Sequence, residues 1–181
     1  MWKLIILSML IAIVHSDMQK FYGKWTTVMS FGTDESFPKC IKYNLSEEND
    51  VQCSCADGKN TPLVELTVDE FSSEKEYREK VRRSIPVIEA SSAADVKSLL
   101  NVTCTCGEEQ NMDRLIVRSI NEEYYVAYYN NYDPKNVGGP GVAIVQAKNV
   151  QKASEIENIV SQVDDLSKRS GRIVCSQEIV N

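Results

Sequence analysis

Histidine is almost absent from this chain of 181 residues, because His15 is the only one. It lies in a stretch that we expect to be removed on export, and the remaining chain then cannot form a Ser-His-Asp triad or a Cys-His pair. The remaining chain also cannot hold zinc, copper or haem through an imidazole. The sequence therefore predicts a protein that is not an enzyme and requires no cofactor.

Basic residues are outnumbered as well. The chain has 20 Lys and Arg against 26 Asp and Glu, which gives a formal net charge of −6. Nucleic acids and anionic membranes bind basic patches, so this balance argues against either as the main partner. With 43% hydrophobic and 25% charged residues, the composition is that of a globular protein. The length suits one ordinary domain, or at most two small ones.

Only one long hydrophobic run occurs, at residues 4–14. Lys3 precedes it and the small residue Ser16 follows it, which is the pattern of a secretory signal peptide. A run of this length is too short to cross a bilayer core of about 30 Å. We therefore expect residues 1–16 to be a signal peptide and residues 17–181 to be a secreted, extracellular domain without membrane insertion.

Six cysteines lie in this expected domain, and an even number predicts three disulfides in an exported protein. Four of them belong to two similar segments, at 51–55 and 102–106. Two C-x-C pairs can bind a metal through four thiolates, or they can link the segments through two disulfides. An oxidising compartment favours disulfides and no metal. The sequence leaves the pairing open among Cys53, Cys55, Cys104 and Cys106.

Short apolar or alternating runs, separated by turn residues, dominate the first 150 positions. Many short strands at regular spacing are typical of an all-β sandwich or barrel. The turn signals include the acidic segment 46–50, and also Gly58, Gly107 and Gly138 with their neighbours. The eight predicted strands are 25–31, 40–46, 50–56, 62–70, 98–106, 113–120, 123–130 and 141–147.

Two stretches predict helices. Residues 154–167 open with a capping box, Ser154 and Glu157, and continue with one apolar stripe that must pack against the outside of the sheet. Residues 73–83 open in a similar way but are highly charged, which is typical of a solvated face. Pro86 and the small residues that follow predict a loosely structured connection over 71–97.

The segment 20–25, Lys-Phe-Tyr-Gly-Lys-Trp, resembles the G-x-W signature of lipocalins. Residues 123–149 are similar to the last two strands of that barrel, and the helix predicted at 154–167 falls where the lipocalin helix lies. The chain most resembles the insect bilin-binding and apolipoprotein D-like members, over nearly all of the expected domain except 73–97. The resemblance implies an eight-stranded antiparallel up-and-down barrel with one C-terminal α-helix packed outside.

The resemblance also implies individual contacts. Cys40 and Cys175 fit a family disulfide that joins the second strand to the C-terminal segment. Lys148 stands where an arginine commonly lies over the signature tryptophan, so we expect its cation over the ring without the planar stacking of arginine. The segment 120–122, Ile-Asn-Glu, departs from the T-D-x motif that the family often has before the seventh strand.

The predicted strand order makes the C-x-C pairs difficult to join. Their segments lie on the third and fifth strands, and strands two apart are separated by about 9.6 Å. A disulfide needs Cα atoms within about 7 Å. Either the strand between them is displaced, or the bridges cross a flattened end of the barrel, or the predicted order is wrong.

Side chains alternate along a strand, so outward positions fix the inward ones. The sequons at Asn44 and Asn101 would carry glycans that must reach solvent. The resemblance places the face of Trp25 inside, and the seventh predicted strand has tyrosines on both faces, one for the cavity and one under the helix. The candidate ligand-binding residues are Trp25, Thr27, Met29, Phe31, Ile41, Tyr43, Leu45, Val64, Leu66, Leu100, Val102, Leu115, Val117, Tyr125 and Tyr128.

Two functions remain open. The first is a secreted, monomeric carrier that buries a small hydrophobic ligand of the bilin, carotenoid, sterol, retinoid or fatty-acid class, with tyrosine hydroxyls fixing its orientation. The alternative is a secreted protein-binding module, such as a protease inhibitor or salivary antagonist, acting through the 71–97 connection and the Gly-rich loop at 138–141. An interior filled by its own side chains would favour the second function, and an open cavity would favour the first.

Overall fold

The computed structural model describes residues 18–32, 40–55, 60–69, 81–129 and 142–180. Most of these residues lie in strands, with three short α-helices and one 3-10 helix. In chain order the elements are η1 (Met18–Phe21), β1 (Gly23–Phe31), β2 (Lys42–Cys55), β3 (Asn60–Asp69), β4 (Val81–Glu89), α2 (Ala93–Leu99), β5 (Cys104–Cys106), β6 (Glu109–Met112), β7 (Leu115–Ser119), β8 (Tyr124–Tyr128), β9 (Ala143–Ala147), α3 (Ala153–Ser161), β10 (Gly171–Ile173) and α4 (Gln177–Val180).

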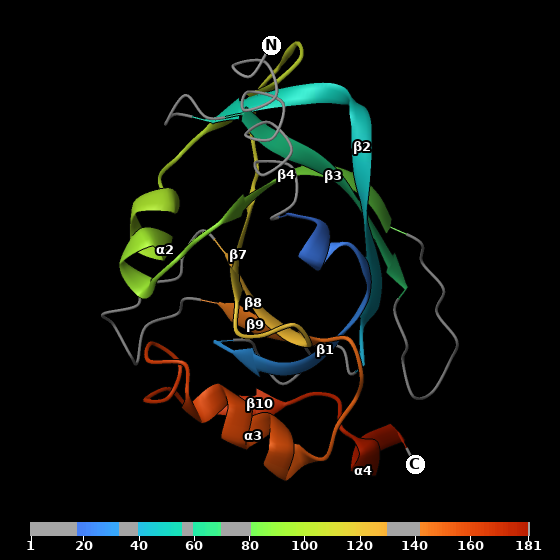
Figure 1. Cartoon of the computed structure of the whole chain (residues 1–181), viewed down its shortest axis with the longest axis vertical. Coiled ribbons are helices and arrows are strands. Elements are labelled where there is room, and N and C mark those ends of the chain that lie inside the picture. Colours follow the sequence, from blue (N-terminus) through green and yellow to red (C-terminus); the bar gives the residue numbers. More distant parts are fainter. Residues whose placement is uncertain (1–17, 33–39, 56–59, 70–80, 130–141, 181) are drawn as a thin grey trace, which may run out of the picture.

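Seven of the strands close into a β-barrel. The order around the ring is β1-β9-β8-β7-β4-β3-β2, and pairing between β2 and β1 closes it. Figure 1 looks into this ring, with η1 drawn in blue inside its outline. All neighbouring pairs are antiparallel except β4 and β7, which are parallel. A ring built only of antiparallel pairs needs an even number of strands, so a ring of seven must contain a parallel pair.

The prediction of an all-β barrel is confirmed, but the expectation of eight antiparallel strands is wrong. Residues 98–106 do not form a wall strand, because the first of them end α2 and the last form β5. Helix α2 is favoured by Ser92, whose hydroxyl accepts a hydrogen bond from the Asp95 N–H. Parallel strands need a crossover of a dozen residues or more, and residues 90–114 form it between β4 and β7.

Three local predictions also differ from the structure where it describes them. The strands predicted at 40–46 and 50–56 are one strand, β2, and the turn expected between them is a shift in register with β3 between Glu47 and Gln52. Extra residues can bulge from a paired strand without reversing the chain. The helix predicted at 73–83 lies mostly outside the described residues, but its last three residues belong to β4, and the predicted loose connection contains β4 and α2.

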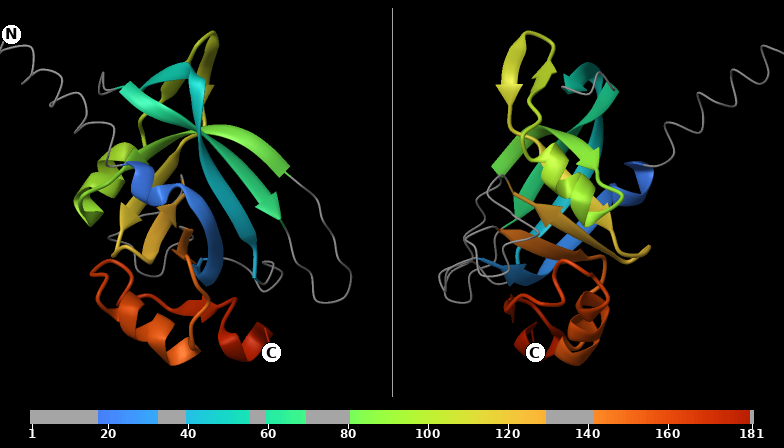
Figure 2. Two further views of the ribbon diagram at one scale, coloured as in Figure 1. Left: turned by 45° about the vertical axis from the view of Figure 1, so that its right-hand side comes forward. Right: turned by 90° about the vertical axis from the view of Figure 1, so that its left-hand side faces the viewer.

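A hairpin of β5 and β6 extends the sheet beyond the ring, and Figure 2 shows it in yellow at the end far from α3. Its strand β5 pairs directly with the end of β2, with Cys106 opposite Cys53 and Cys104 opposite Cys55. Both pairs form disulfides with Cα atoms 4.1 Å apart. Of the three possibilities that the sequence leaves open, the wrong strand order is therefore the one that holds.

Strand β1 pairs with three other strands. One edge lies along β9, while the other pairs with β2 over residues 23–26 and with β10 over residues 29–31. The change of partner coincides with a bulge between Thr27 and Met29 in the pairing with β9. Just after β10, Cys175 forms a disulfide with Cys40, as the resemblance implies. The C-terminal segment is thus held against β1 by hydrogen bonds and beside β2 by a covalent link.

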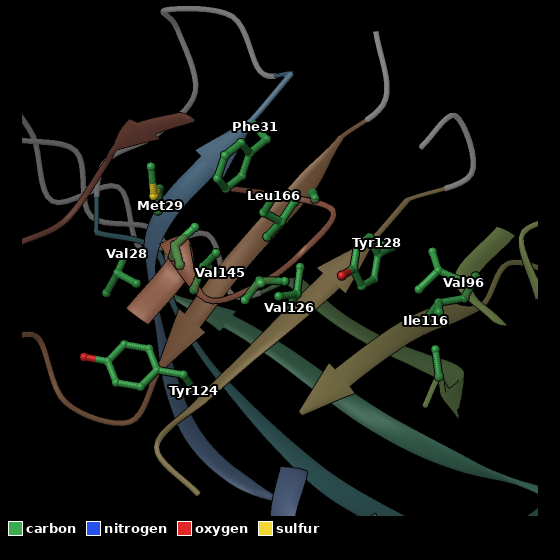
Figure 3. Close-up of a cluster of buried hydrophobic side chains, with 14 of the residues drawn as sticks. Val28, Met29, Phe31, Val96, Ile116, Tyr124, Val126, Tyr128, Val145 and Leu166 are labelled. Carbon is green, nitrogen blue, oxygen red and sulfur yellow. The ribbon is translucent and has the colours of Figure 1, made fainter. Parts of the chain in front are cut away.

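The apolar stripe of α3 and of the turns after it packs on the outside of the barrel, as predicted. Figure 3 shows the resulting cluster, in which side chains from the outer face of β1, β8 and β9 meet Leu166. This outer cluster also includes residues of α2, because Val96 is fully buried there. The buried members from α3 and the following turns are Ile156, Val160, Val163 and Leu166.

The start of α3 differs from the prediction. The helix runs over Ala153–Ser161. Its N-cap residue is Lys152, whose side chain makes no capping hydrogen bond. The expected capping box at Ser154 is therefore wrong. Glu178 of α4 accepts a hydrogen bond from the Ala153 N–H instead. The carboxylate that satisfies this helix end thus comes from a distant part of the chain, which local sequence cannot reveal.

Arg118 of β7 holds the segment that follows α3. Its Nη1 donates to Oδ1 of Asp164 at 3.0 Å and to Oδ1 of Asp165 at 2.9 Å. The Asp165 side chain is only 1% exposed, whereas that of Asp164 is 71% exposed. The hydrogen bond from Arg118 lowers the pKa of the Asp164 carboxyl below its usual range. These bonds connect the helical C-terminal region to the barrel wall.

Replacing Arg118 with methionine should lower the free energy of unfolding by about 2 kcal/mol at neutral pH, because it removes a charged donor from the buried Asp165. The difference between wild type and variant should shrink as the pH falls below about 4, since protonation of Asp164 removes the contribution that depends on its lowered pKa. Urea unfolding at pH 7 and pH 3 with the disulfides intact measures both effects. The exposed Lys168→Met is the control, and an unchanged difference between the two pH values would contradict the prediction.

Candidate functional site

The barrel wall separates two apolar clusters. On β8, Tyr125 and Ala127 point into the ring, whereas Tyr124, Val126 and Tyr128 point out to the cluster under α3. Tyrosines on both faces of this strand are therefore buried on both sides of the wall, as the sequence predicts. The buried members of the inner cluster are Phe21, Trp25, Tyr43, Leu45, Val64, Val87, Leu115, Val117, Tyr125 and Ala127.

Aromatic side chains fill the end of the barrel where η1 enters. Phe21 and Trp25 are each 2% exposed, and the Trp25 Nε1–H donates to the Phe21 carbonyl oxygen at 2.7 Å. Both rings meet Tyr125 edge to face, with centroid distances of 5.4 Å from Phe21 and 4.6 Å from Trp25. The Nζ of Lys148 lies 5.4 Å from the centroid of the Trp25 ring, in the place expected for the cation.

The hydroxyls of Tyr43 and Tyr125 meet inside the barrel. Their oxygens are 2.6 Å apart, and the two residues come from strands on different sides of the ring. Burial raises the pKa of both hydroxyls above 10, because an ionised oxygen would lose its hydration there. The pair is therefore a neutral hydrogen-bonded link across the interior.

A second polar pair lies on neighbouring strands β1 and β9. The Thr27 Oγ1–H donates to Oε1 of Gln146 at 3.2 Å, and the two residues face each other in the ladder. Both are only 2% exposed to solvent. Buried polar side chains are costly unless they are paired, so this hydrogen bond allows an amide to lie in a mostly apolar interior.

A cavity of about 160 Å³ occupies the part of the interior beyond the aromatic end. No charged side chain lines it among the described residues. Tyr129 also lines it and is 45% exposed, which places this residue at the mouth. Small-molecule pockets usually measure about 300–1,000 Å³, whereas an apolar cavity of about 150 Å³ holds benzene. The lining residues are Thr27, Ile41, Tyr43, Leu66, Leu115, Ala127, Tyr129, Ile144 and Gln146.

Ten of the fifteen candidate residues lie on the inner side of the wall. Five of these line the cavity, namely Thr27, Ile41, Tyr43, Leu66 and Leu115. The other five pack in the inner cluster away from the cavity: Trp25, Leu45, Val64, Val117 and Tyr125. Alternation along β2, β3 and β7 is regular at these positions, so the sequence places their side chains correctly.

Met29 and Phe31 were expected on the same inner face as Trp25, and this expectation is wrong. Both belong to the outer cluster, as Figure 3 shows. Thr27 is opposite Gln146 in β9, but Met29 is opposite Val145, so Val28 is an extra residue in β1. A bulge of one residue moves every later side chain to the other face.

Three further candidates are also outside the barrel interior. Leu100 ends α2 and packs in the outer cluster, because the segment expected to be a strand is helical. Val102 lies between α2 and β5, outside the strands of the ring, and does not line the cavity. Tyr128 is on the outer face of β8, beside Val126 and under the C-terminal segment.

Four cavity residues are missing from the sequence-based set. Ala127 and Tyr129 share the face of Tyr125, so alternation along β8 could have identified them. Ile144 and Gln146 alternate along β9 with buried alanine and valine, so that strand is apolar on both faces. A strand of this kind gives no sequence signal for which side faces the cavity.

Within the described parts of the chain, no group of three His, Cys, Asp or Glu side chains could hold a metal ion. No helix in those parts is long and apolar enough to cross a membrane. No family model and no curated protein matches the chain. Its function must therefore be argued from the cavity and from the residues around it.

The Tyr43–Tyr125 pair should make the protein less stable at alkaline pH. Their pKa values are raised in the folded state, so the unfolded chain releases these protons first, and stability falls once the pH exceeds about 10. The loss should reach about 1.4 kcal/mol per pH unit for each hydroxyl. Tyrosinate absorbance and circular dichroism, followed together, should show one ionisation step that coincides with unfolding and that is smaller in Tyr125→Phe. Complete tyrosine ionisation in the folded protein would contradict this.

Proposed function

We propose that this protein is a secreted binding protein that holds one small hydrophobic molecule inside its barrel. The observation that carries this is the cavity of about 160 Å³, which combines an apolar wall with a few buried polar groups. Binding sites for small molecules commonly have this composition. Burial of the ligand's apolar surface would supply most of the affinity.

The seven-stranded barrel favours a smaller ligand than those that the resemblance to lipocalins implies. Barrel diameter grows with strand number, and eight strands leave room for about one small ligand. Seven strands, with Phe21, Trp25 and Tyr125 filling one end, leave less. Bilins, carotenoids, sterols, retinoids and long fatty acids exceed such a space. We therefore propose a ligand of about the size of one substituted ring.

A lipocalin-like relationship and secretion belong to the same proposal. In their support, the signature Trp25 lies at the start of β1 with Lys148 over its ring, and a C-terminal helix packs outside a closed barrel. Three disulfides join the described cysteines, which fits an oxidising compartment. In this proposal the protein binds its ligand and does not catalyse a reaction.

A protein-binding module is the second candidate, and two observations favour it. Most of the barrel interior is filled by its own side chains. The β5–β6 hairpin projects from the barrel and is fixed to β2 by two disulfides, so it presents exposed residues on a rigid support. The 138–141 loop and the start of the 71–97 connection, proposed earlier as contact surfaces, lie outside the described residues.

Calorimetric titration of the secreted, disulfide-bonded protein tests the first function. Ethylbenzene and acetophenone, each with one ring, should bind, whereas retinol and biliverdin should not. Ala127→Phe should weaken binding of both small compounds at least about tenfold, because the new ring would occupy the cavity lined by Ala127.

Ala94→Phe is the matched control, since it makes the same substitution at an exposed position of α2. It should leave both affinities unchanged. Failure of both small compounds to bind would refute the proposed carrier, and slowing of a serine protease by the same protein would then support the second candidate.

We also propose that Asn101 carries an N-linked glycan. Its side chain is exposed beside the end of α2, whereas Asn44 lies half-buried in β2 between Lys24 and Thr67 of the adjacent strands. Protein secreted from eukaryotic cells should lose mass on treatment with peptide N-glycosidase, because solvent-facing sequons are accessible. Asn101→Gln should remove the mass loss that depends on this site. An identical loss in wild type and variant would contradict the assignment.

A further inference from the structure

The polar groups of the cavity indicate what kind of ligand atom they can bind. Tyr43, Thr27 and Gln146 face the cavity from three strands, and all three are mostly or fully buried. A hydroxyl offers one hydrogen to donate, and an amide offers two. The hydrogen bonds inside the protein use only part of this supply.

The hydrogen bond between Tyr43 and Tyr125 uses one of the two hydroxyl hydrogens of this pair. Tyr125 is 1% exposed, packs against the rings of Phe21 and Trp25 and does not line the cavity, so a hydrogen that it did not donate to Tyr43 could not reach a ligand there. The favourable arrangement is therefore donation from Tyr125 to Tyr43. The hydrogen of Tyr43, which lines the cavity, is then available to a ligand.

The Thr27–Gln146 bond leaves donors in the same way. Thr27 donates its only hydrogen to Oε1 of Gln146, so the amide nitrogen is the part of Gln146 that does not take part in this bond. Buried N–H and O–H groups tolerate a missing partner less well than oxygen atoms tolerate an unused lone pair. The cavity is thus better supplied with hydrogen-bond donors than with acceptors for them.

We infer that the cavity selects a small uncharged carbonyl compound, such as a ketone or an ester, whose oxygen accepts hydrogen bonds from Tyr43 and Gln146. This inference rests on the proposed carrier function and names its ligand class. The apolar part of the ligand would contact Ile41, Leu66 and Leu115. A carboxylate is excluded because no basic side chain lines the described cavity, and burying an unpaired charge is costly.

Three probes of similar shape test this selectivity by calorimetry. Acetophenone has a carbonyl, ethylbenzene lacks it, and benzoate carries a charge. Acetophenone should bind about five- to tenfold more tightly than ethylbenzene, and benzoate should show no binding. Equal binding of acetophenone and ethylbenzene would overturn the inference while leaving the carrier function intact. If neither of these two compounds binds, the carrier function itself is refuted.

A pair of Tyr→Phe variants tests whether Tyr43 donates a hydrogen bond to the ligand. Tyr43→Phe should reduce the affinity for acetophenone about five- to tenfold more than it reduces the affinity for ethylbenzene. Tyr124→Phe is the matched control, because its hydroxyl is buried on the outer side of the wall with no hydrogen-bond partner among the described residues. Gln146→Leu should act in the same direction as Tyr43→Phe. Unchanged acetophenone affinity in both cavity variants would overturn the inference.

Discussion

Strand β1 closes the barrel and also holds the C-terminal segment, and its bulge at Val28 lies between these two pairings. Before the bulge, the edge of β1 that faces away from β9 pairs with β2, and after the bulge the same edge pairs with β10. The extra residue also turns Met29 and Phe31 outward, where β10 covers them. Position 171 of β10 is a glycine, and any larger residue would clash there, because a Cβ would lie 2.5 Å from atoms of both Met29 and Phe31.

The number of strands then limits the interior. A ring of seven is narrower than one of eight, and its odd number requires the parallel pair of β4 and β7. The crossover between these strands carries α2 and the β5–β6 hairpin, so the missing wall strand and the disulfide-linked projection have one cause. The small cavity follows from the same topology, with Trp25 and Tyr125 filling the other end.

Local patterns predicted the elements whose signals are local. The regular alternation of β7 and β8, the stripe of α3 and the even cysteine count each depend on residues close in sequence or on the compartment. The errors occurred where long-range pairing overrides local preference. The acidic residues at 46–50 remain within β2 because β2 is paired before and after them, with β1 before, β5 after and β3 at both places. Residues 98–106 leave the wall because Ser92 caps α2 and because Cys104 and Cys106 pair with β2.

The sequence by itself determined that this chain has a β-rich body, a capacity for three disulfides and an interior of apolar and tyrosine side chains. It determined these because composition and alternation fix which surfaces must be buried. Tertiary structure alone decided that Val28 bulges, that Cys53 lies opposite Cys106, and that Thr27 meets Gln146 at the cavity. Register and strand count depend on contacts across the whole ring, and no short segment of sequence contains them.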